Sequence, residues 1–268
     1  MLLVANVSQI MNIPSILGKK IMVFDLDGTI TPSKSPMDSE MADLFEKILD
    51  RMSIAVITGG AFDRFEAQFQ ALTRDADHLS RLFFFPTTGT RFYRSIDGEW
   101  VQVYADEMSE AERKKIRDAF EQAYKDIDYH DPETVYGEIV EDRGTQMTFS
   151  ACGQQAPLEV KEAFKAAHDD RRLALADAVR KLLPDFEVKV PGLTSIDITR
   201  KGIDKGYGIE KIEEHLGIPV SAMVFVGDAL YEGGNDHPVI RTGVETVSVK
   251  DPEETKAVLK QWLAELDG

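Results

Sequence analysis

The chain has 268 residues, and 31 Lys and Arg residues against 47 Asp and Glu residues give it a formal net charge of −16 at pH 7. Hydrophobic residues make up 43% and charged residues 29% of the sequence. This is an ordinary globular composition and excludes a wholly disordered chain. Because so acidic a surface repels phosphate backbones and anionic lipid headgroups, we expect neither nucleic-acid binding nor membrane binding.

The cysteine and histidine content excludes two kinds of structural cross-link, disulfides and zinc sites. Cys152 is the only cysteine, so no intrachain disulfide can form, and none of the five histidines lies at zinc-ligand spacing from another His or Cys. The first 17 residues lack Lys and Arg and are interrupted by Asn and Pro, unlike a signal peptide. No apolar run approaches the ~20 residues that span a bilayer. We therefore expect a cytoplasmic protein.

The first third of the chain alternates strands and helices. Apolar runs at 21–24, 53–57 and 82–85 predict strands that are buried on both faces. Amphipathic segments at 39–50 and 62–72 predict the helices between them. This order is typical of an α/β protein with a doubly wound parallel sheet.

The alternation breaks in the middle and then resumes. The middle elements that we expect are a hairpin over 90–104, a helix over 109–127 with a capping box of Ser109 and Glu112, strands within 136–150 and 185–198, and a helix over 171–183. The later elements are a helix over 205–216, strands over 222–226 and 245–249, and a helix over 252–266. We expect an α/β core domain of residues 1–88 and 196–268, interrupted by an inserted α+β domain of residues 89–195.

Small or acidic polar residues follow three of the buried strands. In chain order they are Asp25, Asp27, Thr58, Gly59, Gly60 and Asp228. A lone Asp at a strand end is more often a helix cap or turn residue, but here three strand ends agree. Because ligands bind beyond the carboxyl ends of the strands in an open parallel sheet, we expect these residues to share one site.

The carboxylates at this site indicate a cation. Asp25 and Asp27 are two residues apart, so both side chains leave an extended chain on the same side. With Asp228 they would repel one another strongly unless a cation lay among them. Oxygen ligands without thiols or imidazoles favour magnesium.

The segment FDLDGT at residues 24–29 resembles the signature of the haloacid dehalogenase (HAD) superfamily of phosphotransferases. The resemblance extends over essentially the whole chain. It implies a Rossmann-like doubly wound core and, because 146 residues separate Thr58 from Lys205, an inserted cap domain of the second class, type B. An ordinary parallel crossover needs only about a dozen residues. Such a cap implies that the substrate is a small phosphorylated metabolite, most often a sugar phosphate.

The resemblance also implies roles for four side chains. Asp25 would be the nucleophile that forms an aspartyl-phosphate, and Asp27 the general acid and then the general base. Thr58 would bind a phosphoryl oxygen, and Lys205 would neutralise charge on the phosphate and on the nucleophile. Taken alone, Thr58 could be a helix N-cap, and a lone lysine such as Lys205 is more often a surface residue.

Magnesium is the cofactor that the resemblance implies. Its ligands would be the carboxylates of Asp25 and Asp228 and the backbone carbonyl of Asp27, with Asn235 and Asp236 supporting the metal and its waters. Phosphoryl transfer depends chiefly on positioning and charge stabilisation, and Mg²⁺ supplies positive charge in an otherwise acidic protein. The pair Gly59–Gly60 would let backbone N–H groups approach the phosphate, although it could also be a simple tight turn.

Within the superfamily, the chain is similar to the eukaryotic-type phosphomannomutases. The motif DLDGTITP at residues 25–32 resembles their opening motif, and Lys34 stands where they have a phosphate-binding arginine. Ser195 and Asp197 match their sugar-contacting pair, and Arg143 begins a segment similar to their phosphate-binding strand. Arg143 could instead be a solvated surface residue, and Ser195 and Asp197 could belong to an ordinary alternating strand.

The chain departs from the phosphomannomutase pattern in the cap. Where these enzymes carry a second and a third arginine, this sequence has Gln154 and Lys161. A mutase must hold two phosphates, and replacing arginine by glutamine removes a charge and a two-pronged grip. We therefore expect a magnesium-dependent phosphatase of a sugar phosphate, with a phosphohexomutase as the alternative. A non-enzymatic phosphate-binding protein is less consistent with the sequence, because every catalytic role has a candidate residue. Either enzyme could be a monomer or a homodimer.

Overall fold

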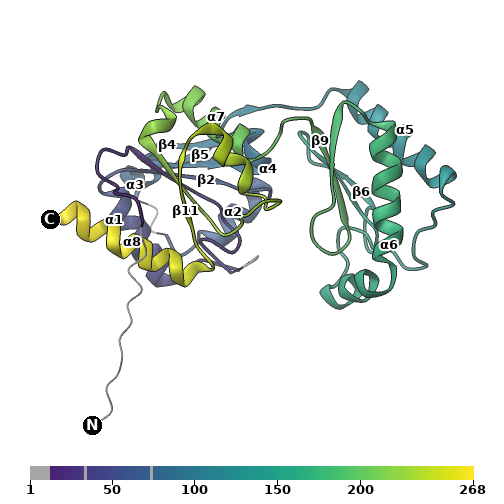
Figure 1. Ribbon diagram of the computed structural model, residues 1–268, viewed down its shortest axis with the longest axis horizontal. Coiled ribbons are helices and arrows are strands. Elements are labelled where there is room, and N and C mark those ends of the chain that lie inside the picture. Colours follow the sequence, from purple (N-terminus) through teal and green to yellow (C-terminus); the bar gives the residue numbers. More distant parts are fainter. Residues whose placement is uncertain (1–12, 33–34, 73–74) are drawn as a thin grey trace, which may run out of the picture.

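The structure is a computed structural model that describes residues 13–32, 35–72 and 75–268 (Figure 1). It contains two separate sheets. Within the described residues, no helix is both long enough and apolar enough to cross a membrane.

The larger sheet has seven strands in the order β11-β10-β1-β2-β3-β4-β5. Five strands run parallel: β1 (Ile21–Phe24), β2 (Ser53–Ile57), β3 (Leu82–Phe85), β10 (Met223–Gly227) and β11 (Glu245–Ser248). The hairpin of β4 (Arg91–Ile96) and β5 (Glu99–Ala105) extends one edge in antiparallel fashion. This arrangement confirms the predicted α/β fold.

Helices cover both faces of the larger sheet because successive strand residues point to opposite faces. Met22 and Phe24 pack with α1 (Ser39–Leu49), α2 (Phe62–Gln68) and α8 (Pro252–Asp267). Ile21 and Val23 pack on the opposite face with α7 (Lys205–Leu216). The shorter elements of this domain are α3 (Ala76–Ser80), α4 (Pro86–Gly89), η1 (Val220–Ala222) and η2 (His237–Thr242).

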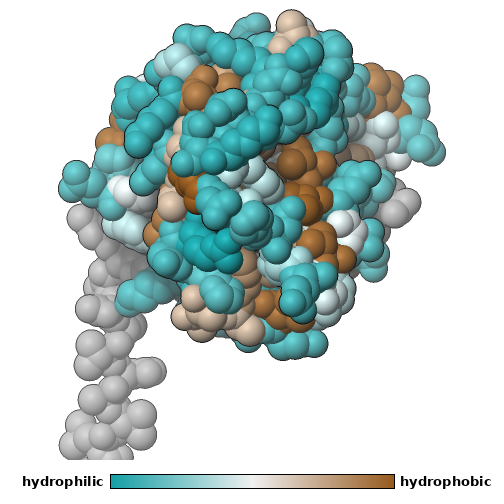
Figure 2. All heavy atoms as spheres, turned by 90° about the vertical axis from the view of Figure 1, so that its right-hand side faces the viewer, coloured by the Kyte–Doolittle hydropathy of each residue, from teal (hydrophilic) through white to brown (hydrophobic). Residues whose placement is uncertain are grey.

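The smaller sheet is antiparallel and has the order β6-β7-β9-β8. Its strands are β6 (Val140–Asp142), β7 (Met147–Ser150), β8 (Phe186–Lys189) and β9 (Ser195–Arg200). The helices α5 (Glu110–Asp126) and α6 (Leu158–Leu182) lie on the side of this sheet away from the larger one (Figure 1). Figure 2 looks onto this outer side of the smaller domain, which is hydrophilic with hydrophobic patches between the polar groups.

The two sheets divide the chain at points different from those expected. The β4–β5 hairpin belongs to the larger sheet, and β9 belongs to the smaller one. We therefore propose that the inserted domain begins after Ala105 and ends after Arg200, and not at residues 89 and 195. The sequence of the hairpin does not show which of the two sheets it joins, because strand-forming patterns do not specify the neighbouring strand.

Candidate functional site

Three of the predicted site residues lie side by side because the strands that precede them are neighbours. β1 pairs with β2 on one side and with β10 on the other, all in parallel. Asp25, Thr58 and Asp228 each follow one of these strands directly. The backbone N–H of Asp25 continues the ladder by donating to the carbonyl of Val226 at 3.0 Å. The structure thus brings the three residues to one edge of the sheet.

A buried lysine joins two carboxylates at this edge. Lys205 is the first residue of α7, and its Nζ donates to Oδ1 of both Asp25 and Asp236. All three residues are buried. The second oxygen of Asp236 accepts the backbone N–H of Ala229 at 2.9 Å. Asp236 therefore holds the lysine in place, and the structure brings Lys205 against Asp25, the residue that the resemblance gives as the nucleophile.

Burial controls the titration of this cluster. It raises the pKa of Asp25 to about 7, against the opposing effect of the Lys205 ammonium and with a further upward contribution from Asp236. Burial by itself lowers the pKa of Lys205, but Asp25 and Asp236 outweigh it and raise that pKa above its ordinary value. A divalent cation beside Asp25 would favour its charged form and lower its pKa again.

Two glycines allow the carboxylates to come this close. A Cβ at Gly28, whose φ is +94°, would lie 2.7 Å from Oδ2 of Asp228. A Cβ at Gly227 would lie 2.7 Å from Cγ of Asp236. The glycines at these two positions are therefore a steric requirement of the acidic cluster.

The acidic cluster fits a hard divalent cation. One oxygen from each of Asp25, Asp228 and Asp236 lies within 4.8 Å of the others. Oδ1 of Asp228 also accepts a hydrogen bond from the Thr29 hydroxyl at 3.3 Å, which orients it. Carboxylate oxygens from three separate segments are the donor set that Mg²⁺ takes, and its positive charge would offset their repulsion.

Asp27 is oriented by a residue that the sequence analysis missed. Gln68, the last residue of α2, donates from Nε2 to Oδ1 of Asp27 at 3.1 Å and to the Thr31 hydroxyl at 2.9 Å. Gln68 is buried. No local motif marks this glutamine, because its role depends on where α2 ends relative to a loop 41 residues earlier in the chain.

A strained turn supports the loop at Thr58. The backbone N–H of Thr87 donates to the carbonyl of Gly60 at 2.9 Å, and that of Thr88 donates to the carbonyl of Thr58 at 2.8 Å. Thr87 and Thr88 have φ values of 47° and 61°, which L-residues rarely adopt. A strained backbone of this kind persists only where its surroundings hold it. Here the two hydrogen bonds hold the turn and fix the backbone of the Thr58 loop beside the acidic cluster.

A pocket of about 280 Å³ lies between the two domains. From the larger domain it is lined by Asp25, Asp27, Thr58, Gly59, Gly60 and Asn235, and from the smaller domain by Arg143, Thr148, Pro191, Gly192, Ser195 and Asp197. The alternation along β9 explains two of the smaller domain's residues: Ile196 and Ile198 enter its core, so Ser195 and Asp197 face the pocket.

Arg143 and Asp197 are the charged groups that the smaller domain contributes to this pocket. Arg143 pairs with Glu141 at 2.6 Å. Burial raises the pKa of Asp197, although hydrogen bonds from Thr148 and Gln146 and the charge of Arg143 lower it. Oδ1 of Asp197 is buried and has no hydrogen-bond partner in the structure. An acceptor oxygen in this state favours a ligand that carries a hydroxyl donor.

The loop that carries Arg143 is fastened to the larger domain. The hydroxyl of Thr145 bonds to that of Thr87 at 3.1 Å and accepts from that of Thr90 at 2.7 Å. Arg91 donates to the carbonyl of Arg143 at 2.8 Å. These contacts tie the position of Arg143 to the same turn that supports Thr58.

Arg172 is a second residue that the sequence analysis missed. It is 3% exposed, pairs with Asp169 and donates to the carbonyls of Pro191, Gly192 and Ser195. It therefore shapes the loop on the cap side of the pocket. Nothing in the sequence around α6 distinguishes it from the other arginines.

Two expected substrate-binding residues, Gln154 and Lys161, are not among the described residues that line the pocket. Gln154 donates its side-chain amide to the carbonyls of Ile139 and Thr148, at 3.2 and 2.8 Å, and so faces the backbone of its own domain. Lys161 lies in α6, outside the set of lining residues. Lys34 falls outside the residues that the structure describes.

The family profile described as "Eukaryotic phosphomannomutase" matches residues 41–265. The chain belongs to this family. Similar proteins include phosphomannomutases of Encephalitozoon cuniculi, 25% identical over 255 residues, and Schizosaccharomyces pombe, 24% identical over 251 residues. These matches cover 92% and 91% of this chain and 95% and 94% of the relatives.

Two solved structures share the fold of this chain. An IMP-bound mutant of Plasmodium falciparum IMP-nucleotidase has a TM-score of 0.65 and 15% identity, covering 93% of this chain and 68% of its own. Aspergillus fumigatus trehalose-6-phosphate phosphatase has a TM-score of 0.54 and 16% identity, covering 92% and 93%. The family match confirms the predicted membership of the HAD superfamily with a phosphomannomutase-like sequence.

Proposed function

We propose that this phosphomannomutase-family enzyme moves a phosphoryl group between two hydroxyls of a hexose phosphate. The main support is the interdomain pocket, which has Asp25 and Thr58 at one end and Arg143 on the opposing domain. A sugar phosphate held there would present one anionic group to each domain. The names of the relatives, phosphomannomutases from several eukaryotes, favour the same reaction.

Asp25 is the nucleophile in this proposal. Its carboxylate oxygen attacks phosphorus, the bond from phosphorus to the sugar oxygen breaks, and an aspartyl-phosphate results. The Lys205 ammonium, which already contacts Asp25, offsets the negative charge of the phosphate as it approaches. Mg²⁺ held by Asp25, Asp228 and the Asp27 carbonyl, with Asp236 and Asn235 beside it, would supply further charge neutralisation.

Asp27 donates and accepts the protons of the reaction. Protonated, it gives its proton to the sugar oxygen that leaves phosphorus, and ionised, it takes the proton from the hydroxyl that attacks the aspartyl-phosphate. The hydrogen bond from Gln68 keeps Asp27 in one orientation for both steps. The attacking hydroxyl belongs to the sugar in a mutase and to water in a phosphatase.

The cap selects the sugar. The unpartnered Oδ1 of Asp197 would accept a sugar hydroxyl, and Ser195 and Thr148 offer hydroxyls beside it. Arg143 would hold the second phosphate of a sugar bisphosphate, exchanging part of its contact with Glu141 for the phosphate oxygens.

Hydrolysis is the second candidate, and Gln154 favours it. Its amide is occupied by two backbone carbonyls, so the cap presents Arg143 as the one cationic side chain among the described residues that line the pocket. A single guanidinium paired with a carboxylate holds a second phosphate less firmly than several arginines would. Water would then compete with the sugar hydroxyl for the aspartyl-phosphate.

Phosphorus NMR distinguishes the two reactions. The enzyme is supplied with Mg²⁺, a hexose carrying an anomeric phosphate, and a catalytic amount of the matching bisphosphate. Migration of the phosphate without release of inorganic phosphate supports the mutase, whereas release alone identifies a phosphatase. Asp25→Asn should abolish both reactions, and Asp43→Asn, an exposed aspartate on α1, should change neither.

Arg143→Gln separates the roles of the cap and the core. Because Arg143 would contact the second phosphate, we expect KM for the bisphosphate to rise by about tenfold or more while the rate of aspartyl-phosphate formation is retained. Arg51→Gln, which removes an exposed ion pair with Asp267, is the control. An unchanged KM in Arg143→Gln would favour the single-phosphate reaction of a phosphatase.

A further inference from the structure

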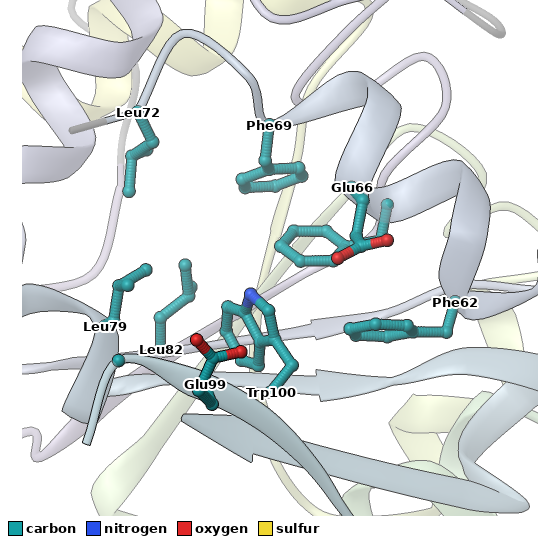
Figure 3. Close-up of a pocket in the computed structure, with 10 residues that line it drawn as sticks. Phe62, Glu66, Phe69, Leu72, Leu79, Leu82, Glu99 and Trp100 are labelled. Carbon is teal, nitrogen blue, oxygen red and sulfur yellow. The ribbon is translucent and has the colours of Figure 1, made fainter. Parts of the chain in front are cut away.

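A second cavity lies on the larger domain, away from the interdomain pocket. It has a volume of about 230 Å³ and lies between α2, α3 and the β5 strand (Figure 3). Its lining residues are Phe62, Phe65, Glu66, Phe69, Leu72, Leu79, Leu82, Gly98, Glu99 and Trp100. It shares none of them with the interdomain pocket.

The lining combines aromatic rings with negative charge. The Trp100 indole lies edge-on to Phe65 and Phe62, at centroid distances of 5.4 and 5.9 Å. Among the described residues that line the cavity, Glu66 and Glu99 are the charged ones, and both are carboxylates. Figure 3 shows Glu66 on α2 and Glu99 on β5.

This chemistry matches a small organic cation. The faces of aromatic rings attract cations, and carboxylates at the mouth add Coulomb attraction and hydrogen-bond acceptors. A cavity of about 150 Å³ accommodates benzene, so this larger one has room for a single ring with a short charged chain. An anionic sugar phosphate, in contrast, would be repelled by both carboxylates.

We propose that this cavity binds a small arylalkyl ammonium ion, with its ring against Phe65, Phe69 and Trp100 and its ammonium between Glu66 and Glu99. Binding there also acts on the catalytic site through α2. This helix begins at Phe62, two residues after the Gly59–Gly60 loop, and ends at Gln68, which holds Asp27. A ligand that packs against α2 therefore affects both the phosphate loop and the general acid. The binding step itself does not depend on the proposed reaction.

The indole signals of the full chain provide a direct test with phenethylammonium as the probe. The protein has two tryptophans, and Trp262 is fully buried elsewhere, with its Nε1 bonded to the carbonyl of Pro14 at 2.9 Å. In heteronuclear NMR spectra, titration should shift the Trp100 indole resonance saturably and leave that of Trp262 unchanged. Phenethyl alcohol, the neutral analogue, should bind about five- to thirtyfold more weakly.

Charge variants complete the test. Glu66→Gln and Glu99→Gln should each weaken phenethylammonium binding, and the double variant should bind it no better than the alcohol. Glu162→Gln, an exposed glutamate on α6, is the matched control. Equal affinity for the amine and the alcohol, or no saturable shift of Trp100, would overturn the binding site.

The effect on catalysis has its own readout. Saturating phenethylammonium should change the rate of phosphoryl transfer in the unmodified enzyme but not in the double variant. Binding without any change in rate would overturn the connection through α2. Loss of phosphoryl transfer in all samples, with the Trp100 shift intact, would instead count against the proposed function alone.

Discussion

The ammonium of Lys205 is buried against the carboxylate of Asp25, 180 residues earlier in the chain. The larger sheet and the start of α7 meet at this contact, and Asp236 completes it. In the proposed reaction these three groups would carry the charge that phosphoryl transfer requires. The ammonium of Lys205 would then supply a local positive charge where the phosphate approaches the Asp25 carboxylate.

Removing this lysine should damage both stability and activity. In Lys205→Met, Asp25 and Asp236 lose their shared cation, and we expect the free energy of unfolding to fall by about 3 kcal/mol. The rate of aspartyl-phosphate formation should fall by about a hundredfold or more. Urea unfolding and rapid-quench kinetics measure the two effects.

An exposed lysine provides the control. Lys260→Met removes a surface ion pair with Glu40, which contributes at most about 1 kcal/mol. It should leave phosphoryl transfer unchanged. Full activity in folded Lys205→Met protein would contradict the assignment of Lys205 to the catalytic site.

Magnesium should stabilise the folded protein through the acidic cluster. Because Mg²⁺ would bind the native carboxylates and not the unfolded chain, a concentration of about 100 times its Kd should add about 2.7 kcal/mol to the free energy of unfolding. Thermal unfolding with and without MgCl₂ shows this as a rise in Tm. EDTA should reverse the rise and abolish turnover.

Asp228→Ala identifies where the ion binds. This variant should lose most of the Mg²⁺-dependent rise in Tm, whereas Asp43→Ala, on the exposed face of α1, should retain it. A rise of the same size in Asp228→Ala would show that the ion binds elsewhere.

Gln68 should act as a positioning residue for Asp27. Gln68→Glu keeps the shape of the side chain but replaces its amide donor with a carboxylate that repels Asp27. We expect kcat to fall by about tenfold or more with little change in KM, and the pH profile of kcat to shift because the new carboxylate adds negative charge beside Asp27. Gln70→Glu, an exposed neighbour, should leave the profile unaltered.

The pH profile of kcat in Gln68→Glu distinguishes a positioning role of Gln68 from a purely structural one. A variant that is merely less stable would lose active protein at every pH without moving the profile. A lower kcat with an unshifted profile would therefore argue against the contact with Asp27 as the cause.

The cap should lose stability in acid through Glu112. Hydrogen bonds from Arg200, with those of the capping box, lower the pKa of Glu112 from 4.5 to about 2. Because the folded-state pKa is the lower one, this stabilisation is complete above about pH 4.5 and is lost as the pH falls toward 2. Glu112→Gln should reduce stability at pH 7 and should reduce it progressively less as the pH falls.

Unfolding by urea at a series of pH values measures this convergence. Glu121→Gln, an exposed glutamate on the same helix, provides the comparison. A difference between the original protein and Glu112→Gln that stays constant from pH 7 to pH 3 would disprove the ion pair's contribution.

Local patterns predicted most of the fold. The buried strands β1, β2, β3 and β10 follow from short apolar runs, and the capping box at Ser109 and Glu112 marks the start of α5 as predicted. The sequence analysis missed the first half of α6, residues 158–170. This helix is kinked at His168, where φ is −141°, so its two halves do not share one continuous apolar stripe.

The candidate site was predictable where its residues follow strands and was not predictable where they act across the fold. Asp25, Thr58 and Asp228 could be grouped because parallel strands deliver their carboxyl ends to one edge of a sheet. Gln68 and Arg172 could not, since neither belongs to a motif. The resemblance placed Gln154 where phosphomannomutases carry a phosphate-binding arginine, but two backbone carbonyls hold its amide.

The sequence by itself determined the kind of chemistry. Acidic residues after buried strands, the FDLDGT segment and the long insertion can all be recognised from the order of residues alone. Only the tertiary structure decided which side chains meet, because contacts such as Lys205 with Asp25 and Gln68 with Asp27 depend on how strands pair and helices pack. Those arrangements come from packing that is summed over the whole chain. A pattern of a few residues cannot contain them.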